Sequence, residues 1–303
     1  MRLGRWATCV VCAAALLLAG TAASAAVTYP VPYSFAAGVT AETLRPGSSP
    51  PGSNDWSCHP STAHPYPVVL VHGTFGDMTD SWQALSPLLA NAGYCVFALN
   101  YGGAAGNPIQ ATGDIPTSAA QLASFVSRVL AATGAPQVDI VGHSQGGMMP
   151  RWYLKFLGGA SLVHTLVGLA PSNHGTTVDG LATLTASSPG FGSALDAFCV
   201  ACTQQLAGSS FLATLNAGGD TVPGPTYTVI ETKDDEVVTP YTSAFLTGPA
   251  VTNIVVQQQC ATDFADHLAI IYDRVALADV LHALDPSDTA PIPCALVLPG
   301  VGG

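Results

Sequence analysis

The chain has 303 residues, of which 49% are hydrophobic and only 9% are charged, and its formal net charge is −11. Such an acidic chain is a poor electrostatic partner for nucleic acid or anionic lipid, so we expect no nucleic-acid partner and a neutral substrate. The length fits one large α/β domain, because strand and helix patterns alternate without a break that looks like a linker. We expect the protein to be a monomer.

The first 25 residues have the features of a secretory signal peptide. Arg2 and Arg5 precede the almost wholly apolar run Ala7–Ala19, and Ala23–Ala25 resembles a small-residue cleavage site. The apolar run is too short for a spanning helix, which needs roughly 20 such residues. We therefore predict a secreted, extracellular protein with no transmembrane anchor, whose net charge falls from −11 to −13 once Arg2 and Arg5 are removed.

Cysteine usage agrees with an oxidising compartment. Two of the eight cysteines, Cys9 and Cys12, lie in the leader, and the other six can pair completely, although spacing alone does not resolve their connectivity. Cys199 and Cys202 form a C-x-x-C motif, but nothing around it resembles a thioredoxin unit, which favours a small structural loop over redox chemistry. Neither cysteines nor histidines have the spacing of a zinc site, so we predict no metal and no cofactor.

Residues 26–66 are rich in Pro, Gly and Ser and are expected to form an N-terminal arm, while residues 67–303 are expected to form the domain itself. Alternation of strands and helices in that domain predicts a mostly parallel sheet with helices on both faces. Residues 172–225 break this pattern with short Ser-, Thr- and Gly-rich pieces and are predicted to be a small cap insertion at the edge of the sheet where ligands bind. The predicted strands are Val68–Val71, Cys95–Leu99, Val138–Val141, Val163–Leu169, Tyr227–Glu231 and Ile254–Gln258, and the predicted helices are Ser81–Ala92, Thr117–Ala132 and Asp273–Leu284.

The segment from Gly142 to Gly146 reads Gly-His-Ser-Gln-Gly and directly follows one of these strands. The pattern is typical of a nucleophile elbow, in which a strand turns sharply into a helix and a strained serine occupies the apex. Glycines flank the serine because helix and strand pass closely there. Ser144 is therefore the candidate nucleophile of a serine hydrolase.

A serine hydroxyl needs a base to take its proton, and in this fold the base comes last in the chain. His267 lies in a loop after the last predicted strand, a position that suits a base above the sheet edge. His282 lies within the closing helix, where an ordinary helical histidine is the simpler interpretation. His164 and His174 precede the acid strand, so chain order disfavours them, although His174 falls in the predicted cap.

A carboxylate must orient the base, and the loop after the strand Tyr227–Glu231 offers several. From position alone Asp234 and Asp235 are nearly even candidates, and Glu236 is a weaker third. Asp263 and Asp266 flank the predicted base in sequence and are more simply explained as residues that shape its loop.

Stabilising the oxyanion requires two main-chain N–H donors, one from the residue after the nucleophile and one from the turn after the first strand. Gln145 and Thr74 are the residues at those positions. Glycines on both sides of the turn allow the Thr74 amide to approach a substrate oxygen. His72, at the start of this turn, is interpreted as a structural residue.

From about Pro67 to Cys294 these motifs resemble secreted lipases of the α/β-hydrolase superfamily, particularly bacterial extracellular triacylglycerol lipases and the yeast lipase B. The nucleophile segment Ser-Gln-Gly-Gly, beginning at Ser144, and the Gly-Thr pair ending at Thr74 carry the resemblance. It implies an α/β-hydrolase fold, an acyl-enzyme mechanism on lipid esters, transient contact with a lipid interface, and a role for the Thr74 hydroxyl beside its amide. Short-chain esterases and polyester depolymerases use the same machinery, and a non-catalytic lipid-binding protein is the remaining alternative.

The same resemblance chooses among the candidate residues. The segment Asp-Glu-Val-Val-Thr-Pro that begins at Asp235 is similar to the family's acid segment, which assigns the acid to Asp235 rather than Asp234. The stretch from Cys260 to His267 is similar to the family's base segment. Two family disulfides correspond to Cys58–Cys95 and Cys260–Cys294, which leaves Cys199–Cys202 as the third pair.

Overall fold

The computed structural model describes residues 1, 4, 28–177 and 198–303. Nearly all of the expected leader and the middle of the expected cap insertion lie outside the described residues. None of the helices in the described ranges is long and apolar enough to cross a membrane.

Six parallel strands form the central sheet, in the order β2-β1-β3-β4-β5-β6. The first strand pairs with β2 on one side and with β3 on the other, so that Val71 lies beside both Leu99 and Gly142. Chain order reverses at this pair, and the carboxyl ends of β1 and β3 meet where ligands bind in open α/β sheets. The strands are β1 (Val68–Val71), β2 (Val96–Leu99), β3 (Val138–His143), β4 (Val163–Leu169), β5 (Thr226–Glu231) and β6 (Val251–Val255).

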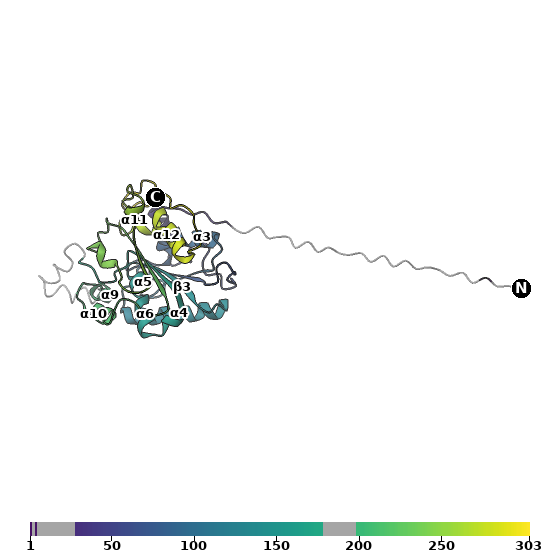
Figure 1. Ribbon diagram of the computed structural model, residues 1–303, viewed down its shortest axis with the longest axis horizontal. Helices are drawn as coiled ribbons and strands as arrows, with labels where there is room; N and C mark the ends of the chain where they lie inside the picture. The colour runs from purple at the N-terminus through teal and green to yellow at the C-terminus, as the bar shows by residue number, and fades with distance from the viewer. Residues whose placement is uncertain (2–3, 5–27, 178–197) are drawn as a thin grey trace.

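Two apolar clusters cover the two faces of the sheet. Val69 and Val71 belong to one cluster and Val68 and Leu70 to the other, as expected for side chains that alternate along a strand. Figure 1 shows the corresponding helices on opposite sides of the strands, with α4, α6, α9 and α10 on one side and α3 and α12 on the other. The predicted parallel sheet with helices on both faces is confirmed. The helices on the first side are α4 (Ile115–Thr133), α6 (Pro150–Phe156), α9 (Val200–Gln204) and α10 (Ser210–Asn216), and those on the second are α3 (Leu85–Asn91) and α12 (Arg274–Leu284).

The predicted helix over Ser81–Ala92 is confirmed only from Leu85 to Asn91, as α3, and its predicted start is wrong. Ser81 instead ends the separate helix α2 (Met78–Ser81), and the chain breaks at Trp82. Asp77 starts α2 early by accepting the N–H groups of Thr79 and Asp80. Pro87 has no N–H to bond the carbonyl four residues back, so a helix continuous through Gln83 cannot form its hydrogen bond there.

The last strand lies three residues earlier than predicted. It is β6 (Val251–Val255), and the residues after it turn into the short helix α11 (Val256–Gln259). This is an edge strand whose Thr252 and Asn253 are exposed, so its apolar pattern is weak. Pairing with β5, which ends opposite Val255, fixes where it stops.

The N-terminal arm contains a helix that its composition does not predict, α1 (Phe35–Leu44). Gly38 lies so close to the helix α2 that a Cβ atom would come within 2.2 Å of the Asp80 carbonyl oxygen. The ring of Phe35 meets Tyr272 edge to face, and the Tyr272 hydroxyl donates to the same carbonyl. Tertiary packing, rather than propensity, therefore holds this helix.

Disulfides join Cys58 to Cys95, Cys199 to Cys202 and Cys260 to Cys294, the pairs that the resemblance implies. The first ties the arm to the residue before β2. The second opens α9, and the third joins the residue after α11 to the C-terminal segment.

Removing Cys58–Cys95 should cost far more stability than removing Cys199–Cys202, because the first spans 37 residues and the second only 3. In the chain-entropy model the free energy of unfolding falls by about 4 kcal/mol for Cys58→Ala/Cys95→Ala and by about 1.5 kcal/mol for Cys199→Ala/Cys202→Ala. Urea unfolding of the two double variants measures both values. Equal losses would contradict the loop-length argument.

Candidate active site

Ser144 lies at the sharp turn between β3 and the short helix α5 (Gln145–Met148). Its backbone has φ 54° and ψ −122°, a strained conformation for a residue other than glycine. A Cβ on Gly142 would lie 1.9 Å from the Gly146 carbonyl oxygen, and one on Gly146 would lie 2.1 Å from the Val71 carbonyl oxygen. Glycine is therefore required at both positions, and the turn brings Ser144 against the end of β1.

Asp235 and His267 are joined by a hydrogen bond, although they come from loops on different strands. The Nδ1 atom of His267 lies 2.8 Å from Oδ2 of Asp235, and both side chains are buried. The other carboxylate oxygen accepts the N–H groups of Val237 and Val238 at 2.8 and 2.6 Å. Burial on its own would raise the pKa of Asp235, but His267 and these two N–H groups outweigh it and lower the pKa.

Both main-chain polar groups of His267 are hydrogen-bonded, which holds the loop that carries its imidazole. The His267 N–H donates to Oε2 of Glu236 at 3.2 Å, and the His267 carbonyl accepts from Nε2 of His143 at 2.9 Å. Burial, together with the neighbouring His267, lowers the pKa of His143 to about 3, so this ring is neutral near pH 7 and donates from Nε2. The residue before Ser144 thus fixes the loop of the candidate base.

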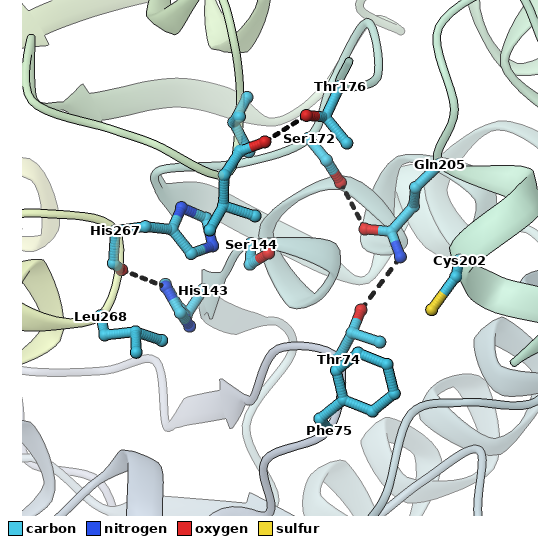
Figure 2. Close-up of a pocket in the computed structure, with 12 residues that line it drawn as sticks. Thr74, Phe75, His143, Ser144, Ser172, Thr176, Cys202, Gln205, His267 and Leu268 are labelled. Carbon is cyan, nitrogen blue, oxygen red and sulfur yellow. Dashed lines mark hydrogen bonds between the residues drawn. The ribbon is translucent and has the colours of Figure 1, made fainter. Parts of the chain in front are cut away.

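Ser144 and His267 line the same cavity, which has a volume of about 310 Å³. Figure 2 shows the Ser144 side chain between the His267 imidazole and Thr74. Most of the remaining lining is apolar, including Phe75, Val238 and Leu268. The cavity therefore offers an apolar space directly in front of the serine.

Thr74 and Gln145 meet beside Ser144, as the turn after β1 comes close to the elbow. A Cβ on Gly73 would lie only 3.1 Å from the Ser144 Cβ atom. Among the described residues, no backbone acceptor bonds the N–H of either Thr74 or Gln145. The Thr74 hydroxyl donates to the Gln145 side-chain oxygen at 2.7 Å, so its proton is directed at that side chain.

Sequence reasoning missed Gln205 and Ser172, which complete this polar group. The Gln205 amide donates to the Thr74 hydroxyl at 2.9 Å and to the Gln145 side-chain oxygen at 3.2 Å. Its own oxygen accepts from Ser172 at 2.8 Å (Figure 2). No motif marks Gln205, because its place depends on α9, the disulfide-bounded helix that ends just before it.

The other candidate histidines are engaged elsewhere. His164 bonds Asp139 at 2.9 Å, and His174 bonds Asp220 at 3.0 Å. His72 stacks on a tyrosine ring, and burial lowers its pKa to about 4. His282 lies on α12, beside a different surface pocket.

The remaining carboxylates near the site also have local roles. Asp234 is exposed, whereas Asp235 is buried against His267. Asp266 accepts the N–H groups of Leu268 and Ala269, and so shapes the loop after the candidate base. Within the described ranges no group of three or more histidine, cysteine or acidic side chains is arranged to hold a metal ion.

Two curated proteins share part of this sequence. A triacylglycerol lipase of Pseudarthrobacter phenanthrenivorans and one of Burkholderia plantarii are each 37% identical over 92 residues. The matches cover 29% of this chain, and 27% and 24% of those two proteins. The chain thus spans about a quarter of the length of these relatives.

Solved structures agree with the fold. Lipase B of Aspergillus fumigatus has a TM-score of 0.58 at 22% identity, covering 82% of this chain and 58% of that one. A mature lipase of Bacillus licheniformis has a TM-score of 0.57 at 18% identity, covering 78% of this chain and 96% of that one. At these identities the likeness establishes the α/β-hydrolase fold.

A family model described as "Lipase (class 2)" matches residues 65–277, from just before β1 into α12, and includes every candidate catalytic residue. The match extends over well more than half of the chain, and the elbow, the candidate acid Asp235 and the candidate base His267 follow one another in the order that is usual for the fold. The chain belongs to the class 2 lipase family.

Proposed function

We propose that this protein is a secreted serine hydrolase that cleaves carboxylic esters of lipids, triacylglycerols first among them, through an acyl-enzyme. The observation that carries the proposal is the buried hydrogen bond between His267 and Asp235 at a cavity that Ser144 also lines. The two relatives are triacylglycerol lipases, and this relationship and the family membership support the proposal. The predicted leader and the disulfides support secretion, with residues 67–303 as the catalytic domain and 172–225 as a cap-like insertion.

In the proposed reaction Ser144 Oγ attacks the ester carbonyl carbon while His267 takes the hydroxyl proton. Asp235 fixes the imidazole through Nδ1 and stabilises its positive charge. The carbonyl oxygen, now negative, receives the N–H groups of Thr74 and Gln145. The intermediate collapses, and the alcohol leaves with the proton from His267. Water then attacks the acyl-enzyme carbonyl while His267 takes one of its protons, and Ser144 leaves with that proton as the acid is released.

Apolar side chains at the cavity favour a lipid substrate. Phe75 and Leu268 line the cavity while remaining 47% and 43% exposed, and Phe198, 66% exposed, stacks near Phe75 with ring centroids 6.3 Å apart. Large exposed apolar side chains that surround a cavity are typical of a surface that binds lipid. An acidic protein would use such a surface on neutral rather than anionic lipid.

Ser144→Ala should abolish hydrolysis of nitrophenyl esters and of triacylglycerol emulsions, because it removes the hydroxyl that the proposed reaction uses as nucleophile in the cavity that His267 also lines. Ser127→Ala is the matched control, since that exposed hydroxyl bonds only its own helix. A phenylmethyl-type serine reagent should inactivate the wild type and label Ser144. Unchanged turnover in Ser144→Ala would refute the proposal in favour of a lipid-binding role.

Gln205→Leu should lower kcat by about tenfold with little change in KM, because Thr74 and Gln145 lose the amide that holds them. Steady-state kinetics on a soluble ester measure both constants. Gln83→Leu, which removes an amide bonded only within α2 and the turn after it, should keep wild-type kcat. A change confined to KM would assign Gln205 to substrate binding instead.

Phe75→Ser/Phe198→Ser should reduce hydrolysis of long-chain triacylglycerols above their solubility limit and leave short, dissolved nitrophenyl esters nearly unaffected. The reason is that only the aggregated substrate needs the apolar rim, by which we mean the exposed side chains of Phe75, Phe198 and Leu268. A panel of esters of increasing chain length, assayed below and above the solubility limit, measures this. Equal losses on both substrate types would contradict the rim, and preference for dissolved short chains or for polyesters would replace the lipase assignment by the corresponding esterase.

A further inference from the structure

Glu231, the last residue of β5, carries a carboxyl group that the reaction described above does not use. Its side chain is 0% exposed. One carboxyl oxygen, Oε1, accepts the N–H of Thr232 at 2.8 Å. The other, Oε2, is buried, and no N–H or O–H donor in the described parts of the chain reaches it. An ionised carboxylate in this position would leave one of its oxygens without compensation.

The group with which Glu231 interacts is the Asp235 carboxyl, four residues further along the chain and buried as well. Asp235 already receives the N–H groups of Val237 and Val238 and the imidazole of His267, all of which favour its ionised form. Two carboxylates in contact cannot both ionise readily, so the proton resides on the one that lacks donors. Burial, and then the charge of Asp235, raise the pKa of Glu231 well above its usual value.

We propose that Glu231 is a positioning residue that stays protonated at neutral pH and donates a hydrogen bond from Oε2 to the Asp235 carboxylate. The proposal rests on the catalytic role assigned to Asp235 above. The bond adds one more donor to the Asp235 carboxylate, beside His267 and the two N–H groups, and so helps to fix the carboxylate in the orientation that His267 needs. It also leaves the buried pair with a single negative charge, which is the charge that the imidazolium needs.

Other titratable groups near β5 do not replace this arrangement. Lys233, Asp234 and Glu236 lie in the exposed turn after the strand, and Glu236 bonds the His267 N–H. The neighbouring strands β4 and β6 end in Leu169 and Val255. The helix α12 packs on β5, and its titratable side chains are engaged elsewhere. Arg274 lies over the Tyr33 ring, Asp279 accepts from Gln259, and His282 lines a surface pocket. The Asp273 that caps the helix interacts with Asp263.

Glu231→Gln tests the proton directly, because its amide keeps an acceptor for Thr232 and a permanent donor for Asp235. A wild-type Glu231 that keeps its proton in the fold, but releases it near pH 4.5 when unfolded, makes folding weaker as pH rises above that value. The amide of the Glu231→Gln variant does not titrate and has no such loss. The Tm of Glu231→Gln minus that of wild type should therefore grow as pH is raised from 4.5 to 8, while Asp234→Asn, an exposed neighbour, shows no such growth.

The pH dependence of kcat/KM gives the second measurement. Replacing a neutral Glu231 by Gln should leave the acid limb of the profile in place, whereas removing an ionised carboxylate would shift it to lower pH by about one unit or more. Glu231→Leu, which lacks the donor, should lose about tenfold in kcat, whereas Glu231→Gln should keep kcat close to the wild-type value.

A Tm difference that is independent of pH, or an acid limb that moves in Glu231→Gln, would overturn the proposal. The Tm measurement needs no activity, so it separates failure of this inference from failure of the proposed ester hydrolysis. If Glu231→Leu keeps wild-type kcat and the same acid limb, the proton is present but positions nothing, which also overturns the proposed role.

Discussion

The structure depends on a close contact between two main-chain segments, the glycines of the elbow and the carbonyl groups at the carboxyl end of β1. Gly146 packs on the Val71 and His72 carbonyls at a distance that no side chain allows. This contact brings the turn containing Thr74 beside Ser144 and forces the serine into its positive φ. The strained backbone conformation of Ser144 is therefore held in place by main-chain packing. The strand β3 that leads to Ser144 pairs with β1 on one side and with β4 on the other, and these pairings fix its position.

Burial and hydrogen-bond donors together determine which side chains of the site are charged. His143 is kept neutral by its surroundings and therefore acts as a fixed donor to the base loop, while Asp235 stays ionised because three donors converge on it. Burial therefore goes with a neutral ring at His143 and with an ionised carboxylate at Asp235. Donor count, rather than depth, decides which group carries charge.

Much of this could be read from the sequence, and the failures have physical causes. The elbow, the parallel strands and the long helix α4 were predicted because glycine spacing, apolar runs and 3.6-residue periodicity are local signals. Choosing Asp235 over Asp234 from position alone was not possible, since only the fold decides which of two adjacent carboxylates is buried. Helix α1 and the edge strand β6 were missed or misplaced because tertiary contacts, not their own patterns, determine them.

Gln205 shows most clearly why a site cannot be completed from motifs. It belongs to the insertion between β4 and β5, and it reaches the Thr74 hydroxyl across 131 positions of sequence. The Cys199–Cys202 disulfide closes the first turn of α9, and Gln205 directly follows this helix. The C-x-x-C motif therefore helps to position Gln205, which is a structural role and not a redox role. The insertion thus contributes to the polar group beside Ser144 as well as to the wall of the cavity, and a change in the insertion's conformation would alter both together.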